Sequence, residues 1–196
     1  MNSEYSRWYR TFLGIRQRHT YWIYKVIDEV LNENKQVKGI IETGTGAGAL
    51  SVFLGLECYE RGLKPLMTYD LKKFVTEKAG IKAYKEPRLF KLLNIKYVVR
   101  DCFNWKSIME IKEYADQPIL FMCDGGDKLG EFNLFTGLLK KGSIIASHDW
   151  ESVARSKLTE ENTKETVELY SLKSLHKEEW NSPPDYIKTC FWRKEI

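Results

Sequence analysis

A glycine-rich stretch carries the clearest chemical signal in this sequence. It runs from Glu42 to Gly48 (ETGTGAG), directly after a short apolar run and before a segment whose apolar residues recur at helical spacing. Glycines allow a tight turn and a close approach of the backbone to a ligand, and the following helix offers unpaired N–H groups. Asp70, at the end of the next predicted strand, could accept two hydrogen bonds from a ribose diol. The pattern predicts a site for a nucleotide-type cofactor, and a tight turn without a ligand is the alternative.

Acidic residues also follow the later predicted strands. Asp101 comes directly after the third strand, Asp124 after the fourth, and His148 and Asp149 after the fifth. In an open parallel sheet, ligands bind in the crevice at the carboxyl ends of the strands. We therefore expect these side chains to lie near one crevice.

Apolar patterning predicts the elements that would position these residues. Strands alternate with helices long enough to cross over a sheet, which indicates an α/β fold with a mainly parallel sheet covered by helices on both faces. A last strand after a Ser-Pro-Pro turn is expected to pair antiparallel. The predicted strands cover 40–41, 65–69, 96–100, 118–123, 143–147 and 187–192, and the predicted helices cover 20–34, 50–56, 105–114 and 131–139.

One domain of 196 residues is expected, because a typical domain has about 100 to 200 residues and no linker interrupts the pattern. We divide it into an N-terminal helical segment (1–36), a cofactor-binding core (37–150) and an acceptor-side region with a C-terminal hairpin (151–196). The stretch 151–177 is polar and lacks a clean period, so no element is assigned to it.

Composition narrows the function classes. The 31 Lys and Arg residues against 27 Asp and Glu residues give a net charge of +4, spread along the chain, which makes a nucleic-acid partner unlikely as a sequence-based expectation. The N-terminus lacks the apolar stretch of a secretory signal, and no apolar run reaches the roughly 18 residues of a membrane span. The four cysteines form no C-x-x-C pair, and with three histidines they form no zinc motif of ordinary spacing. We expect a cytoplasmic protein with reduced thiols.

Several segments together resemble a known superfamily. The run IETGTGAGAL over 41–50, followed by Thr68-Tyr69-Asp70, resembles the first two motifs of class I S-adenosylmethionine-dependent methyltransferases. The preceding amphipathic helix and the upstream Gly14-Ile15-x-Gln17 are similar to the cephalosporin hydroxylase and rhamnosyl O-methyltransferase group. The segments 121–128 and 145–149 are similar to strand ends of that group and of the metal-dependent caffeoyl-CoA and catechol O-methyltransferases. The resemblance implies a Rossmann-like methyltransferase fold.

The resemblance also implies cofactor-binding roles. In that superfamily an acid opens the glycine loop, the loop binds the methionine part of S-adenosylmethionine, and the acid after the second strand binds the ribose. We expect Asp101 to meet the adenine amino group. The expected cofactor-binding residues are Glu42, Gly44, Thr45, Gly46, Gly48, Asp70, Asp101 and Asp124.

A divalent cation is implied by the metal-dependent relatives. Asp124, Asp149 and His148 occupy the matching positions, and Mg²⁺ or Mn²⁺ is the expected ion. His148 replaces a carboxylate of the antibiotic-modifying relatives, which favours Mn²⁺ or a softer metal. Lys128 lies four residues after Asp124, where the plant-type relatives have a lysine base three residues on.

The expected activity is methyl transfer to a hydroxyl of a small molecule or sugar, with His148 and Lys128 as candidate catalytic residues. Simpler interpretations stay open: Asp124 and Asp149 could cap helices, His148 could make a strand-end hydrogen bond, and Lys128 could be an exposed residue at a helix start. Methylation of a nucleic acid or protein, and a non-catalytic cofactor-binding protein, are the alternative functions. Self-association is left open. The SPPD stretch at 182–185 resembles an adenine-methyltransferase tetrad but lacks its aromatic residue, so we interpret it as a turn.

Overall fold

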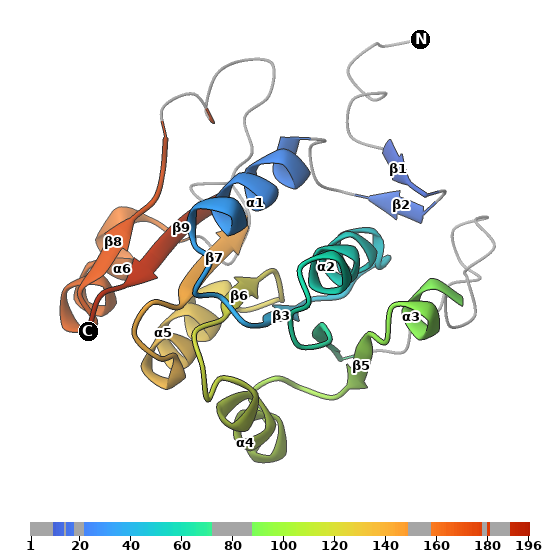
Figure 1. Cartoon of the computed structure of the whole chain (residues 1–196). Helices are drawn as coiled ribbons and strands as arrows, with labels where there is room; N and C mark the ends of the chain where they lie inside the picture. The colour runs from blue at the N-terminus through green and yellow to red at the C-terminus, as the bar shows by residue number, and fades with distance from the viewer. Residues whose placement is uncertain are drawn as a thin grey trace, which may run out of the picture.

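The computed structural model describes residues 10–13, 15–17, 22–71, 88–148, 158–177, 180 and 189–196. Among them is a seven-stranded sheet with the order β5-β4-β3-β6-β7-β9-β8 (Figure 1). The strands from β3 to β7 pair in parallel, whereas β9 runs antiparallel to both of its neighbours. Their bounds are β3 Ile40–Thr43, β4 Met67–Asp70, β5 Lys96–Val99, β6 Leu120–Cys123, β7 Ile144–His148, β8 Leu172–Ser174 and β9 Thr189–Lys194.

The strand order reverses at β3. From β3 the chain passes through α2 to β4 on one side, and β6 pairs with β3 on the other side. A reversal of this kind leaves a crevice between the loops that follow the two central strands, and open α/β sheets bind their ligands there. The predicted α/β fold with an antiparallel C-terminal strand is confirmed.

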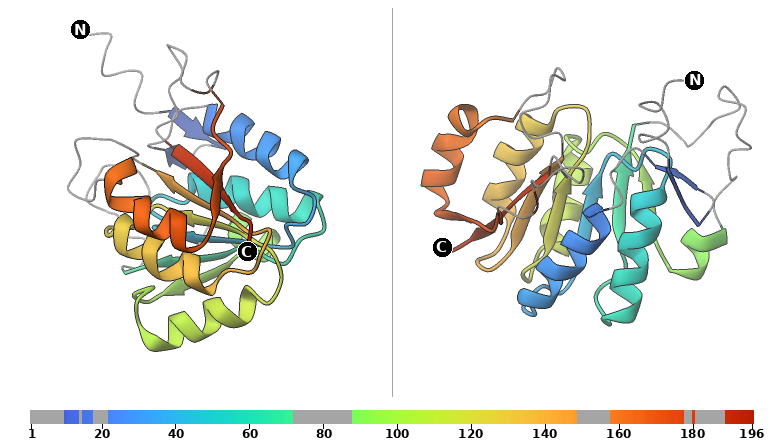
Figure 2. Two further views of the ribbon diagram at one scale, coloured as in Figure 1. Left: turned by 90° about the vertical axis from the view of Figure 1, so that its left-hand side faces the viewer. Right: turned by 90° about the horizontal axis from the view of Figure 1, so that it is seen from above.

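Helices cover both faces of the sheet (Figure 2). The helices α1 and α2 lie on one face, and α4 and α5 lie on the other with α6 beside α5. None of the described helices is both long and apolar enough to cross a membrane. Their bounds are α1 Trp22–Glu33, α2 Ala49–Glu60, α3 Arg88–Leu92, α4 Trp105–Tyr114, α5 Lys128–Leu138 and α6 Glu160–Leu169.

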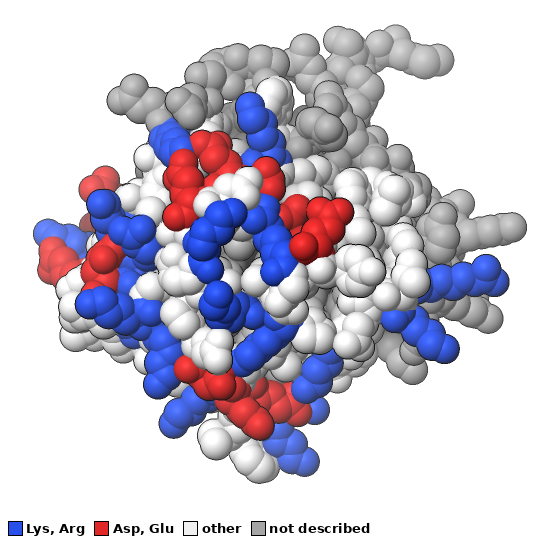
Figure 3. All heavy atoms as spheres, viewed as in Figure 1, with Lys and Arg blue, Asp and Glu red and all other residues white. Residues whose placement is uncertain are grey.

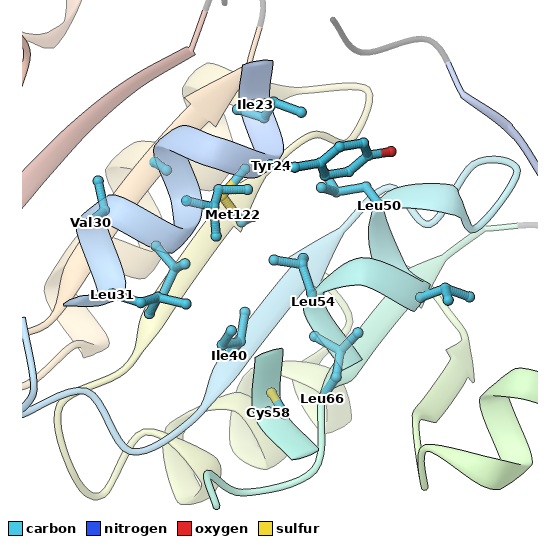
Figure 4. Close-up of a cluster of buried hydrophobic side chains, with 14 of the residues drawn as sticks. Ile23, Tyr24, Val30, Leu31, Ile40, Leu50, Leu54, Cys58, Leu66 and Met122 are labelled. Carbon is cyan, nitrogen blue, oxygen red and sulfur yellow. The ribbon is translucent and has the colours of Figure 1, made fainter. Parts of the chain in front are cut away.

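Alternate residues of the central strands point to opposite faces, so the sheet separates two apolar clusters. Ile40 packs in the cluster under α1 and α2, whereas Ile41 packs in the cluster under α4 and α5. Figure 4 shows the first cluster, in which Ile40 lies between Leu31 of α1 and Leu54 of α2. Because both faces of β3 and β6 are fully buried, these two strands form a rigid support for the loops at their carboxyl ends.

The segment 1–36, expected to be helical, also contains a hairpin. Its strands β1 (Arg10–Phe12) and β2 (Ile15–Gln17) pair antiparallel. Phe12 packs against Tyr24 of α1 and Phe53 of α2, with ring centroids 4.9 and 6.0 Å apart. The hairpin therefore uses the aromatic face that α1 and α2 share, and strands this short leave no periodic signal in the sequence.

Two further elements differ from expectation. The polar stretch 151–177 contains α6 and β8, although no element was assigned to it. The helix predicted to start at Glu131 begins at Lys128, because the Asp127 side chain accepts a hydrogen bond from the Gly130 N–H and caps the helix. The SPPD turn lies outside the described residues.

Candidate active site

The glycine loop after β3 has a backbone that only glycine adopts easily. Gly44, Gly46 and Gly48 have φ angles of +85°, +51° and +82°, in the left-handed region. The Gly44 and Thr45 N–H groups donate to the Tyr69 carbonyl at the end of β4, at 2.8 and 3.2 Å. A Cβ on Gly44 would lie 2.2 Å from the Asp124 carbonyl oxygen, whereas a Cβ on Gly46 would meet only the Gly44 carbonyl oxygen, at 3.8 Å. Gly44 thus packs against the turn after β6, and Gly46 borders open space.

Glu42 lies beneath the loop. Its side chain is 1% exposed and accepts hydrogen bonds from the Ser51 hydroxyl of α2 and, at 2.6 Å, from the Thr68 hydroxyl of β4. The Thr45 and Thr68 hydroxyls also share a hydrogen bond of 2.7 Å. Burial, and after it the charge of the nearby Glu42 carboxylate, raises the pKa of Tyr24 above its usual value. Glu42 therefore joins β3, β4 and α2 under the loop that the sequence assigned to the cofactor.

Asp70 lies at the edge of the crevice where β4 ends. Its Oδ2 atom accepts a hydrogen bond of 3.0 Å from the Gly46 N–H. An ionised carboxylate offers about four acceptor positions, so this bond orients the group without exhausting its capacity to accept. A hydrogen bond therefore joins the glycine loop directly to Asp70, the residue predicted to bind the ribose.

Asp101 follows β5 in an exposed turn. Its Oδ1 atom accepts from the Phe103 N–H at 2.9 Å, and its carbonyl accepts from the Asn104 N–H at 3.1 Å and from the Ser107 hydroxyl at 2.7 Å. Asn104 then caps α4. These bonds fix the turn that carries the predicted adenine ligand beside β4.

Asp124 and Lys128 lie together at the start of α5. The Lys128 Nζ atom is 3.9 Å from the Asp124 carboxylate, and the two side chains are 8% and 13% exposed. Lys128 Nζ also donates to the Gly125 carbonyl at 2.9 Å. Lys128 starts the helix but is buried, so the interpretation of an exposed helix-start residue is wrong. Asp127 caps α5, so the capping interpretation is also wrong for Asp124.

Glu131 is a site residue that the sequence reasoning missed. It is 1% exposed, and its Oε2 atom accepts from the Thr43 hydroxyl at 2.7 Å and from the Gly125 N–H at 3.3 Å. Burial raises the pKa of Glu131 from 4.5 to about 7. An acid in the first turn of a helix is normally attributed to the helix dipole, so its sequence position gave no signal of a buried partner.

His148 ends β7, next to the strand that carries Asp124. β6 and β7 pair with Cys123 opposite Ser147, which brings Asp124 and His148 to neighbouring strand ends. The His148 Nδ1 atom and the Thr189 hydroxyl of β9 share a hydrogen bond of 2.9 Å. Asp149 lies outside the described residues.

The donor set for a divalent cation is incomplete within the described part of the chain. No group of three or more His, Cys, Asp or Glu side chains that could bind a metal forms there. Asp124 supplies the oxygen donor that Mg²⁺ prefers, but a lysine ammonium already lies beside its carboxylate. Of the predicted metal ligands, Asp149 lies outside the described residues, so the predicted set of three is not tested.

Comparison with known proteins rests on structure alone. No protein-family model matches the chain, and no curated protein is significantly similar to it in sequence. Solved structures with the same fold include CmcI without a ligand, with a TM-score of 0.66 at 14% identity over 95% of this chain and 76% of that one. CmcI with S-adenosylhomocysteine has a TM-score of 0.61 at 14% identity, over 95% of this chain and 83% of that one.

A third similar structure is that of CalS11, a TDP-rhamnose 3'-O-methyltransferase of calicheamicin biosynthesis. Its TM-score is 0.59 at 14% identity, over 90% of this chain and 80% of that one. At identities this low, the structural similarity establishes the fold alone. The resemblance drawn from the sequence is confirmed at that level, and the chain has the Rossmann-like fold of these methyltransferases.

Proposed function

We propose that this chain is an S-adenosylmethionine-dependent methyltransferase that acts on a hydroxyl group of a small molecule or sugar. The observation that carries the proposal is the crevice edge between β3 and β4. Three glycines there have left-handed backbone, and the Asp70 carboxylate is bonded to the Gly46 N–H. CmcI, solved with S-adenosylhomocysteine, and CalS11, a sugar O-methyltransferase, share the fold and support the cofactor and the acceptor class.

When bound, S-adenosylmethionine supplies a sulfonium methyl group that is already activated for in-line displacement by an oxygen. The tasks of the protein are to align the acceptor hydroxyl with the methyl group and to take its proton. We assign the cofactor to the glycine loop, Asp70 and Asp101. We assign the proton to His148, whose ring is oriented by Thr189 at the strand end next to Asp124. Lys128 is bonded to Gly125 and beside Asp124, which favours a positioning role.

A finer form of this proposal is a divalent cation on Asp124, Asp149 and His148, in which the second ring nitrogen of His148, Nε2, would bind the cation instead of taking the proton. A CmcI structure with magnesium and S-adenosylmethionine supports it. Such an ion would lower the pKa of the acceptor hydroxyl. Chelator should then lower activity, and Mg²⁺ or Mn²⁺ should restore it. Full activity in excess chelator would leave Lys128 as the cation beside Asp124. A cytoplasmic location and self-association stay predictions from the sequence.

The charge distribution on the face shown in Figure 3 does not favour the nucleic-acid alternative. On the face shown in Figure 3, groups of basic side chains alternate with groups of acidic ones. Phosphate contacts would make any binding to DNA or RNA strongly salt-dependent. Tight binding at physiological salt, with methyl transfer to the polymer, would favour that alternative.

Calorimetry with S-adenosylhomocysteine, S-adenosylmethionine and NAD tests the proposal. The first two should bind and NAD should not. Asp70→Ala should weaken binding about tenfold or more, because hydrogen bonds to charged groups contribute roughly 1.5 to 3 kcal/mol. Asp116→Ala is a matched control, since Asp116 is an exposed acid paired with Lys64, before the amino end of β6. Tight binding of NAD alone would contradict the proposal.

A further inference from the structure

Two ionisable side chains of α5 contact the backbone of the same residue, Gly125. Lys128 donates to the Gly125 carbonyl at 2.9 Å, and Glu131 accepts from the Gly125 N–H at 3.3 Å. Lys128 is 6% exposed and Glu131 is 1% exposed. Both backbone groups of Gly125 are therefore bonded by buried ionisable side chains, one basic and one acidic. We call the set of Gly125, Lys128 and Glu131 the Gly125 clamp.

The clamp is joined to the glycine loop on the other side of the crevice. Glu131 also accepts a hydrogen bond of 2.7 Å from the hydroxyl of Thr43, the residue that precedes Gly44. The Asp124 N–H donates to the Thr43 carbonyl at 3.1 Å. The Asp124 carbonyl oxygen lies 2.2 Å from the position that a Cβ on Gly44 would take. A shift of the Gly125 peptide would therefore be transmitted directly to the first residue of the glycine loop.

Stability alone does not account for this arrangement. Burying charged side chains costs free energy, and apolar side chains of similar size often stabilise a core as well or better. The first turn of α5 does not need these groups either, because Asp127 caps it. What the two side chains provide is a fixed geometry for the two peptide units on either side of Gly125, in the turn after β6.

We propose that Lys128 and Glu131 are positioning residues, which fix the turn 124–126 against the glycine loop and so shape the cofactor crevice. The inference rests on the proposed function and adds to it two residues that act through the backbone. It assigns Lys128 a part other than proton transfer. It also explains why residue 125 is glycine, since a Cβ there would lie 1.9 Å from the Glu131 Oε1 atom.

Substitutions of Glu131 separate positioning from simple packing. Glu131→Gln keeps an acceptor oxygen for Thr43 and Gly125, so its affinity for S-adenosylhomocysteine should stay within about threefold of wild type. Glu131→Met has similar volume but no acceptor, so it should weaken binding about tenfold. The control Thr136→Val removes a buried hydroxyl of the same helix, bonded to Phe132 at 2.6 Å. It should lower thermal stability and leave the affinity unchanged.

A double-mutant cycle at Gly125 gives an independent measurement. Gly125→Ala should weaken binding about tenfold, because its Cβ clashes with Glu131. In an Glu131→Ala background the same substitution should cost little, because the clashing carboxylate is gone. Each affinity is measured by calorimetry below the unfolding temperature of that variant.

The outcomes distinguish this inference from the proposed function. Absence of binding by the wild-type protein would overturn the proposed function and the clamp's role with it. Wild-type binding with equal affinity in Glu131→Met, or strictly additive effects of Gly125→Ala and Glu131→Ala, would overturn the clamp alone. Rescue by Glu131→Gln together with a non-additive cycle is the result that supports it.

Discussion

The two loops at the crevice are stabilised in different ways. The conformation of the loop after β3 is fixed by its own backbone, through left-handed glycines and N–H groups bonded to the end of β4. The turn after β6 contains glycines at 125 and 126 without left-handed backbone. Long side chains of α5, Lys128 and Glu131, fix that turn instead. Backbone sterics therefore fix the loop after β3, and hydrogen bonds from buried ionisable side chains fix the turn after β6.

This difference determines which perturbation affects which side. A methyl group added to the glycine loop acts through strain and clash, which pH does not alter. Neutralising a buried carboxylate at the β6 turn acts through desolvation and hydrogen bonding, which depend on pH and leave volume unchanged. The comparison can therefore be tested with two distinct kinds of experiment.

The largest effect is expected at Gly44. Gly44→Ala adds left-handed strain of about 1 kcal/mol and a clash that typically costs about 1 to 3 kcal/mol. Because the clash is with the Asp124 carbonyl, the variant should lose both stability and cofactor affinity. Gly46→Ala has a similar backbone but its Cβ clashes with no protein atom, so the variant should lose only about 1 kcal/mol of stability. Because the Cβ would enter the space assigned to the cofactor, affinity should fall at least tenfold. Denaturant unfolding and calorimetry measure the two quantities.

Gly62→Ala is the control for strain alone. Gly62 has a φ of +62° at the end of α2, and nothing lies within 4 Å of a Cβ built on it. The variant should lose about 1 kcal/mol of stability and bind the cofactor normally. If Gly46→Ala bound the cofactor as well as Gly62→Ala does, the glycine loop would not border the ligand.

A smaller effect is expected from the pH dependence of the other side. Burial raises the pKa of Glu131 from 4.5 to about 7, so the folded state favours the protonated carboxyl. Its stabilising contribution is complete below pH 4.5 and is lost as the pH rises through about 7. The shift corresponds to roughly 3 kcal/mol at 1.36 kcal/mol per pKa unit. As the pH rises from 4.5 through about 7, the free energy of unfolding of the wild type should therefore fall by roughly 3 kcal/mol relative to that of Glu131→Gln.

Unfolding in urea at a series of pH values measures this difference. Gly62→Ala serves as the matched comparison, since the Gly62 N–H bonds a backbone carbonyl and its strain involves no titrating group, so its stability deficit should be constant with pH. Parallel pH curves for the wild type and Glu131→Gln would show that the pKa of Glu131 is the same in the folded and unfolded protein, and would remove the electrostatic half of the comparison.

The same contrast explains what could be predicted from the sequence. The glycine loop, Asp70 and the strand ends were found because apolar runs such as Leu120–Cys123 end at residues of distinctive type. These signals are local and follow from backbone geometry. Glu131 and its partner Thr43 are 88 positions apart, so no spacing in the sequence connects them.

The missed elements have equally specific causes. The described side chains that α6 buries include Thr163 and Thr166, which give no apolar period. Its capping box pairs Thr159 with Asn162 instead of the usual Glu or Gln, so the start signal was not recognised. The strand β8 has three residues, Leu172–Ser174, and within the described residues it pairs with β9 alone. Tertiary contacts define these elements more than local pattern does.

The smallest effect is expected from carboxylates that keep their local bonds after substitution. Asp101→Asn retains an oxygen for the Phe103 N–H, and Asp70→Asn retains one for the Gly46 N–H, so neither should change stability by more than about 0.5 kcal/mol. Each variant replaces the charged carboxylate, which would accept hydrogen bonds from the cofactor, with a neutral amide, so affinity for S-adenosylhomocysteine should fall about fivefold. Asp101→Ala should add a loss of stability, because the turn before α4 then loses its side-chain acceptor. Calorimetry on the two Asn variants tests whether ribose and adenine are read by charge. If both bound the cofactor like wild type while Gly46→Ala did not, the glycine side would recognise its ligand by backbone shape alone, and the two sides would differ even more sharply.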